Sequence, residues 1–198
     1  MNINWKYPPP RKNLLGALDR FIGPGATSAE VWLQIVPPVL AGISIPLYAI
    51  LSSLEWNIAQ LFVAGLLAFD MTGGIITNAT STAKRWYHRD GQGFQQHFVS
   101  STAHIVHLFL VAWLFRSLDW GFFVATTLYL LVATVIILKS PLYLCRPVAY
   151  LLYAIALLMG VYGFTPTVGL EWFLPFFYLK LLISHLLREE PYRPTSET

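Results

Sequence analysis

The chain alternates between long apolar runs and short polar connections. Six runs are long enough to cross the roughly 30 Å of bilayer hydrocarbon as α-helices, which takes about 20 residues each. They lie at residues 31–53, 57–79, 99–116, 119–138, 145–163 and 168–187. Apolar residues follow one another along these runs without strict alternation, which favours helices over the strands of a membrane barrel. The pattern predicts an all-α, multi-pass integral membrane protein with six transmembrane helices.

The segments outside these runs are short. Residues 1–30 are polar and rich in proline, but Asn13–Ile22 places leucine, phenylalanine and isoleucine at helical spacing. This spacing predicts a short amphipathic helix lying on the membrane surface. No repeat, low-complexity tract or linker divides the chain, so we expect one transmembrane domain at 31–187, followed by a tail at 188–198.

Composition excludes several classes of protein. Hydrophobic residues make up 56% of the chain and charged residues only 12%, whereas soluble domains carry about 25% charged residues. A soluble enzyme and a disordered chain are therefore excluded. The chain has one cysteine and so can form no internal disulfide. It also lacks a phosphate-binding loop, a nucleophile elbow and a dinucleotide fingerprint, and we expect no nucleic-acid partner.

Basic residues predict the orientation in the membrane. With six spans, eleven of the thirteen Lys and Arg residues fall on one side. The other side receives Arg116, and Lys180 lies within the last run. Cytoplasmic segments carry the excess of Lys and Arg, so both termini are expected in the cytoplasm, with the protein in a plasma or inner membrane.

Ionisable residues inside the spans are the candidate functional groups, because they are costly in lipid and mark functional sites by default. All lie in the cytoplasmic half of their spans, where Asn78 and Thr77 add polar groups on the second span. The ionisable residues are Asp70, His104, His107, Lys180 and His185, and His97 lies near the cytoplasmic end of the third span.

These groups suggest a metal centre. A histidine pair three residues apart presents both rings to one ion, and His ligands with a carboxylate suit zinc or iron. We expect His104, His107 and His185 to be ligands, with His97 as a replacement for His185. Asp70 is then the fourth ligand or a general base.

The leading functional hypothesis is a metal-dependent membrane hydrolase that acts on a lipid or another amphipathic substrate. Basic residues that follow the second span attract anionic lipid headgroups. Lys84, Arg85 and Arg89 are therefore expected to hold the substrate headgroup. The surrounding bilayer is the expected partner, and assembly into an oligomer or a larger complex is left open.

Three alternatives remain. In a proton-coupled carrier, Asp70 beside Gly73 and Gly74 lies in a locally broken helix, with Lys180 as its counter-ion. In a haem protein, His104 or His107 and His185 bind a b-type haem. The third alternative is a structural subunit of a larger complex. On a regular α-helix, Lys180 and His185 lie about 140° apart, so we do not expect them to face one cavity.

Overall fold

The computed structural model describes residues 2–193, with Asn13 described by its backbone alone. Apart from one pair of two-residue strands, its regular structure is helical. The helices are α1 (Asn13–Ile22), α2 (Ser28–Leu51), α3 (Ile58–Ala79), α4 (Ser81–Tyr87), α5 (Phe94–Ala103), α6 (Ile105–Phe115), α7 (Trp120–Lys139), α8 (Leu142–Tyr162), α9 (Phe173–Tyr178) and the π-helix η1 (Leu179–His185).

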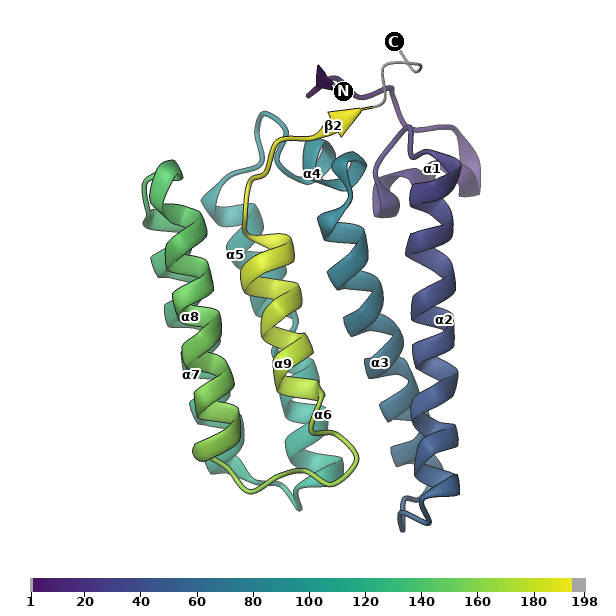
Figure 1. Ribbon diagram of the computed structural model, residues 1–198, viewed down its shortest axis with the longest axis vertical. Coiled ribbons are helices and arrows are strands. Elements are labelled where there is room, and N and C mark those ends of the chain that lie inside the picture. Colours follow the sequence, from purple (N-terminus) through teal and green to yellow (C-terminus); the bar gives the residue numbers. More distant parts are fainter. Residues whose placement is uncertain (1, 194–198) are drawn as a thin grey trace.

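Within residues 2–193, five helical segments are long and apolar enough to cross a membrane. They are α2, α3, α5 with α6, α7 and α8. The long helices run along the long axis of the molecule, and residues 2–3 and 192–193 lie beyond the same end of the bundle (Figure 1). We call this end, which also carries α4, the terminal end. These five helices agree with the multi-pass membrane class predicted from the sequence, whereas the sixth apolar run forms a shorter helix.

The sixth apolar run forms a shorter helix than expected. Its helical part extends from Phe173 to His185, rather than over 168–187, because residues 163–172 form a loop and residues 187–191 have no regular structure. This helix packs between α3 and α8 (Figure 1). Phe177 and Leu182 are fully buried there, so the shortest apolar helix forms the core of the bundle.

Small residues and prolines bring α2 and α3 close together. A Cβ atom on Gly65 of α3 would lie 2.8 Å from the carbonyl oxygen of Gly42 and 3.0 Å from Pro46 Cγ. Small residues at such crossings allow helix backbones to approach closely in membranes. The helix α2 continues through its three prolines, and two of them, Pro38 and Pro46, face glycines of α3.

The two ends of the chain meet at the terminal end. Strand β1 (Asn2–Ile3) pairs antiparallel with β2 (Tyr192–Arg193). This strand pair departs from a purely all-α fold; it joins residues that are far apart in sequence, so no local pattern predicts it. The predicted helix at Asn13–Ile22 is present as α1, with Leu14 and Phe21 exposed. Residues 194–198 of the predicted tail lie outside the described residues.

Candidate functional site

Three helices place charged or titratable groups around the carboxylate of Asp70. Lys180 of η1 lies 2.6 Å from Asp70 Oδ2 through its Nζ atom. His107 of α6 lies 3.1 Å from the same oxygen through its Nε2 atom. The side chain of Lys180 is 5% exposed, whereas that of Asp70 is 41% exposed. Asp70 is therefore the accessible member of the ion pair.

The absence of a side chain at Gly74 makes the ion pair possible. A Cβ atom at Gly74 would overlap Lys180 Cε and lie 2.6 Å from its Cδ. Lys180 therefore crosses the surface of α3 at Gly74, one helical turn from Asp70, before it reaches the carboxylate. The second span is unbroken beside Gly73 and Gly74, contrary to the locally broken helix that the carrier alternative expected there.

The third span has a one-residue irregularity instead. Helix α5 ends at Ala103 and α6 begins at Ile105, so His104 stands between them. The His104 ring donates from Nδ1 to the Ser100 carbonyl oxygen at 2.8 Å, and it stacks on the His107 ring at 5.2 Å between centroids. A neutral imidazole that donates from Nδ1 keeps Nε2 as an acceptor. The predicted span 99–116 therefore begins earlier, at Phe94, and is interrupted at a candidate residue.

The remaining histidines form a second group nearer the terminal end. His97 Nδ1 lies 3.3 Å from His185 Nε2. His88, in the connection after α4, stacks on His97 at 4.6 Å and places Nε2 3.1 Å from the His185 carbonyl oxygen. Burial, together with the neighbouring His97 and Lys84, lowers the pKa of His88 to about 2. His88 is therefore neutral over the physiological pH range.

The expected metal ligands are divided between these two groups. His104 and His107 lie with Asp70, whereas His185 pairs with His97. Within residues 2–193, no three His, Cys, Asp or Glu side chains are arranged to hold a metal ion. The four-ligand centre expected from the sequence is not assembled in this structure.

Both groups nevertheless border one cavity of about 190 Å³, here called the Asp70 cavity. Lys180 and His185 line it together, contrary to the expectation that they face apart. The reason is the π-helix η1, whose hydrogen bonds join residues five apart, so a fifth residue returns to the same face. Polar groups of other helices complete the wall, including Gln34, Thr77, Asn78 and Ser100.

The three basic residues expected to hold a headgroup are engaged within the protein. The Lys84 side chain is 2% exposed, and its Nζ donates to the carbonyl oxygens of Ser184 at 2.7 Å and Leu187 at 2.5 Å. Burial lowers the pKa of Lys84 to about 8, against the opposing effect of Glu189.

Arg85 is also buried and donates to the carbonyl oxygens of Lys6, Pro24 and Gly25. The Arg89 guanidinium lies over the Trp86 ring and donates a hydrogen bond to the backbone carbonyl oxygen of Trp86. Of the three, only Arg89 escapes full burial, and its role toward a headgroup stays a prediction. The burial of Lys84 and Arg85 argues against that role for them.

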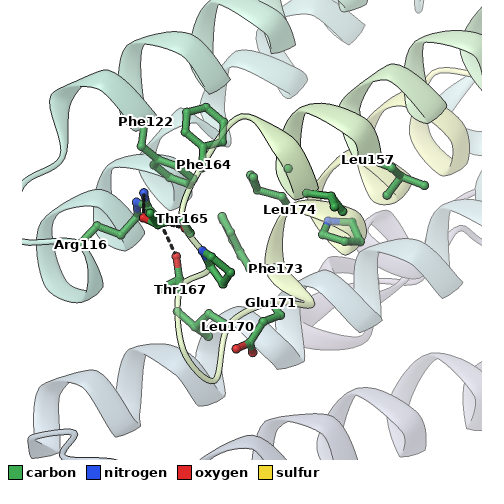
Figure 2. A pocket seen from close by; sticks show the side chains of 14 residues that line it. Arg116, Phe122, Leu157, Phe164, Thr165, Thr167, Leu170, Glu171, Phe173 and Leu174 are labelled. Atoms are coloured by element: carbon green, nitrogen blue, oxygen red, sulfur yellow. Dashed lines mark hydrogen bonds between the residues drawn. The ribbon is translucent and has the colours of Figure 1, made fainter.

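A second cavity, of about 200 Å³, lies beside the loop between α8 and α9 (Figure 2). Arg116 borders it, with the guanidinium 4.4 Å from the centre of the Phe122 ring. The guanidinium donates to Asp119, to Thr165 and to Thr167. These bonds engage its donors and anchor the loop before α9, so this arrangement is explained by structure alone.

Gln34 is a residue of the Asp70 cavity that the sequence analysis does not predict. It lies in α2, is 6% exposed, and its Oε1 and Nε2 atoms have no hydrogen-bond partner among the described residues. The signal was present, because Gln34 is a polar residue within the first apolar run. It carries no charge, however, so it does not stand out among the ionisable residues that mark functional sites in a span.

The comparisons with known proteins do not identify a relative. No family model matches the chain, and no curated protein or solved structure matches it.

Proposed function

We propose that this protein is a proton-coupled membrane carrier of a small solute and that Asp70 is its proton-binding group. The observation that carries the proposal is the contact of one accessible carboxylate with both Lys180 and His107 from separate helices. Carboxylates inside membrane bundles that pair with basic groups occur in the proton relays of pumps and transporters.

The contact with Lys180 distinguishes two mutually exclusive protonation states of Asp70. As a carboxylate it holds the Lys180 ammonium, and η1 is then bound to α3. A proton on Asp70 removes the negative charge and releases Lys180. His107 Nδ1 lies 3.2 Å from the His104 carbonyl oxygen. When both ring nitrogens of His107 carry protons, the ring can donate to that oxygen and to Asp70. Transfer of its Nε2 proton to Asp70 exchanges one state for the other.

Irregularities in two helices beside the Asp70 cavity support the proposal that this site changes conformation during transport. The third span is interrupted at His104, and α9 continues into the π-helix η1. Transporters place substrate sites at discontinuous helices, and π-helical turns occur frequently at functional sites. Both irregularities carry residues that line the Asp70 cavity.

Proton movement in proteoliposomes tests the proposal. Vesicles that contain the pH dye pyranine receive sodium chloride, lithium chloride, erythritol, acetamide or alanine while valinomycin and potassium clamp the membrane voltage. The wild type is expected to change the internal pH with at least one probe. Asp70→Asn is expected to reduce the rate at least tenfold.

Controls separate loss of coupling from loss of fold. Asp90→Asn makes the same change in an exposed connection and is expected to retain the wild-type rate. The double variant Asp70→Asn/Lys180→Met removes both charges, so it leaves no buried ammonium unpaired, and it is expected to be as inactive as Asp70→Asn. A wild type that moves no protons with any probe, or an Asp70→Asn variant as active as wild type, contradicts the proposal.

The metal-dependent hydrolase and the haem protein remain predictions. The hydrolase needs His185, or His97 in its place, beside His104 and His107, and the haem protein needs His185 opposite His104 or His107. The separation of His185 into a pair with His97 favours the carrier instead.

We further propose that the terminal end of the bundle is cytoplasmic in a plasma or inner membrane. Eleven of the thirteen Lys and Arg residues belong to that side if the helix Phe173–His185 is the sixth crossing. The positive-inside rule then places both termini in the cytoplasm.

A further inference from the structure

The side-chain amide of Gln34 is a buried group without a partner in the wall of the Asp70 cavity. Its residue is 6% exposed, and neither Oε1 nor Nε2 has a hydrogen-bond partner within residues 2–193. A buried polar atom left unpaired destabilises the folded state, because it loses its hydrogen bonds to water without replacing them. Such a group therefore requires an explanation.

From this we infer that the Asp70 cavity binds a small uncharged solute that both donates and accepts hydrogen bonds, such as a short polyol or a primary amide, through the Gln34 amide. The inference rests on the proposed carrier function, because it names the class of solute that the carrier moves.

The chemistry of an amide selects this class. Gln34 Oε1 accepts and Nε2 donates, so a solute must supply a donor and an acceptor to satisfy both atoms. A metal cation satisfies the oxygen and leaves the N–H group unpaired. Because both atoms lack a partner, exchanging the assigned oxygen and nitrogen leaves this argument unchanged.

The charges on the cavity wall agree with an uncharged solute. Asp70 and Lys180 form an ion pair, so their charges balance. Thr77 and Asn78 of α3 add hydroxyl and amide groups on the same wall. A solute with several hydroxyl or amide groups can bond to these residues and to Gln34 together.

The cavity volume is sufficient for a solute of a few carbon atoms. About 190 Å³ corresponds to roughly six water molecules at about 30 Å³ each. Erythritol, with four carbons and four hydroxyl groups, suits such a space. Sorbitol, which is half as long again, serves as the oversized probe.

Uptake of radiolabelled erythritol into proteoliposomes with an inward proton gradient tests the inference. The wild type is expected to take up erythritol well above protein-free vesicles and to exclude sorbitol. Gln34→Leu keeps a similar volume without polar atoms and is expected to lower erythritol uptake at least tenfold. Leucine leaves no polar group unpaired, so the variant is expected to unfold at a temperature no lower than wild type.

Thr134→Val is the matched control. Thr134 in α7 also has a buried side-chain oxygen without a partner, but it is not part of the cavity wall. Erythritol uptake by Thr134→Val is expected to equal that of wild type. Equal uptake by Gln34→Leu and wild type overturns the inference, as does the absence of uptake of both erythritol and acetamide by wild type.

The outcomes distinguish this inference from the proposed function. If sodium or lithium ions drive proton movement while erythritol and acetamide are not taken up, the carrier proposal stands and the neutral solute is wrong. If erythritol enters through Gln34 but Asp70→Asn has no effect, the solute class stands and proton coupling through Asp70 is wrong.

Discussion

A methyl group at residue 74 would occupy the space through which Lys180 reaches Asp70. We expect Gly74→Ala to push the lysine methylenes from α3 and break the ion pair, since Cβ would overlap Lys180 Cε and lie 2.9 Å from Cγ. Overpacking typically costs about 1–3 kcal/mol of unfolding free energy. Thermal unfolding in detergent and the proton-movement rate measure the two effects.

The adjacent glycine provides the control. A Cβ atom on Gly73 would meet Pro38 at 3.4 Å, an ordinary contact distance. Gly73→Ala makes the same change in helix propensity, worth up to about 1 kcal/mol in favour of alanine. If both variants unfold at the same temperature and move protons equally, Lys180 does not depend on the space at Gly74.

The pKa of His88 predicts a weakening of the fold in acid. The folded value of about 2 lies below the ordinary value of 6.5. Below pH 6.5 the unfolded chain therefore takes up a proton that the folded chain does not, and the free energy of unfolding falls as the pH falls. The contribution of His88 is at most about 1.4 kcal/mol per pH unit.

Denaturation in detergent at pH 7.5 and pH 5 measures this slope. His88→Gln is expected to lose less stability than wild type over that interval, because glutamine does not titrate. Identical slopes for the two proteins would show that His88 takes up its proton equally well in both states.

At the scale of single residues, part of the site follows from the sequence. Asp70 stands out as a charge in an apolar run, and Lys180 was named as its counter-ion in the carrier alternative. The spacing of residues along the sequence does not show whether His185 belongs to the same centre as His104. Helical periodicity gives only the face of its own helix on which a residue lies. It does not fix which neighbouring helix that face meets.

Among the elements, the end of η1 depends on a lysine from another helix. Lys84 donates to the carbonyl oxygens of Ser184 and Leu187, and carbonyl groups at a buried helix end require a partner. Lys84→Met leaves both without this donor, and we expect the free energy of unfolding to fall by at least about 2 kcal/mol.

Lys139→Met tests whether this effect belongs to the site. Lys139 ends α7 and is exposed, so its replacement is expected to change stability by less than about 0.5 kcal/mol. Limited proteolysis near residue 188 should accelerate in Lys84→Met alone. Equal stability of the two variants would show that η1 ends without help from Lys84.

Helix type is the feature of the elements that the sequence does not reveal. The apolar pattern predicts a helix near residues 168–187, yet it does not distinguish an α-helical turn from a π-helical one. The π-helix η1 is selected by its contacts with α3, α7 and α8, which are tertiary. That choice brings Lys180 and His185 to one cavity, so an angle calculated for a regular α-helix was wrong there.

For the whole molecule, orientation can be tested with cysteines introduced into a Cys145→Ala background. Glu55→Cys lies in the connection between α2 and α3, and Asp90→Cys lies in the connection after α4; both positions are exposed. An impermeant maleimide added to intact cells is expected to label Glu55→Cys at once and Asp90→Cys only after lysis. The reverse pattern would place the termini outside the cell.

The overall architecture was largely accessible from hydrophobicity. Long apolar runs predict α2, α3, α7 and α8 because crossing lipid requires each span to satisfy its own backbone. The sequence does not predict that Phe173–His185 is buried at the centre of the bundle, because every apolar run has a similar composition. Which run the others surround depends on packing between helices.

The central position of the last helix sets an order for assembly in the membrane. Ribosomes synthesise α3 more than a hundred residues before Lys180, so Asp70 enters the bilayer while its partner does not yet exist. During that interval the nascent chain holds a carboxyl group in lipid with no cation beside it, which favours protonation or delayed insertion of α3. A chain stopped before residue 173 would retain the five long spans without their centre and would be a natural substrate for membrane quality-control proteases.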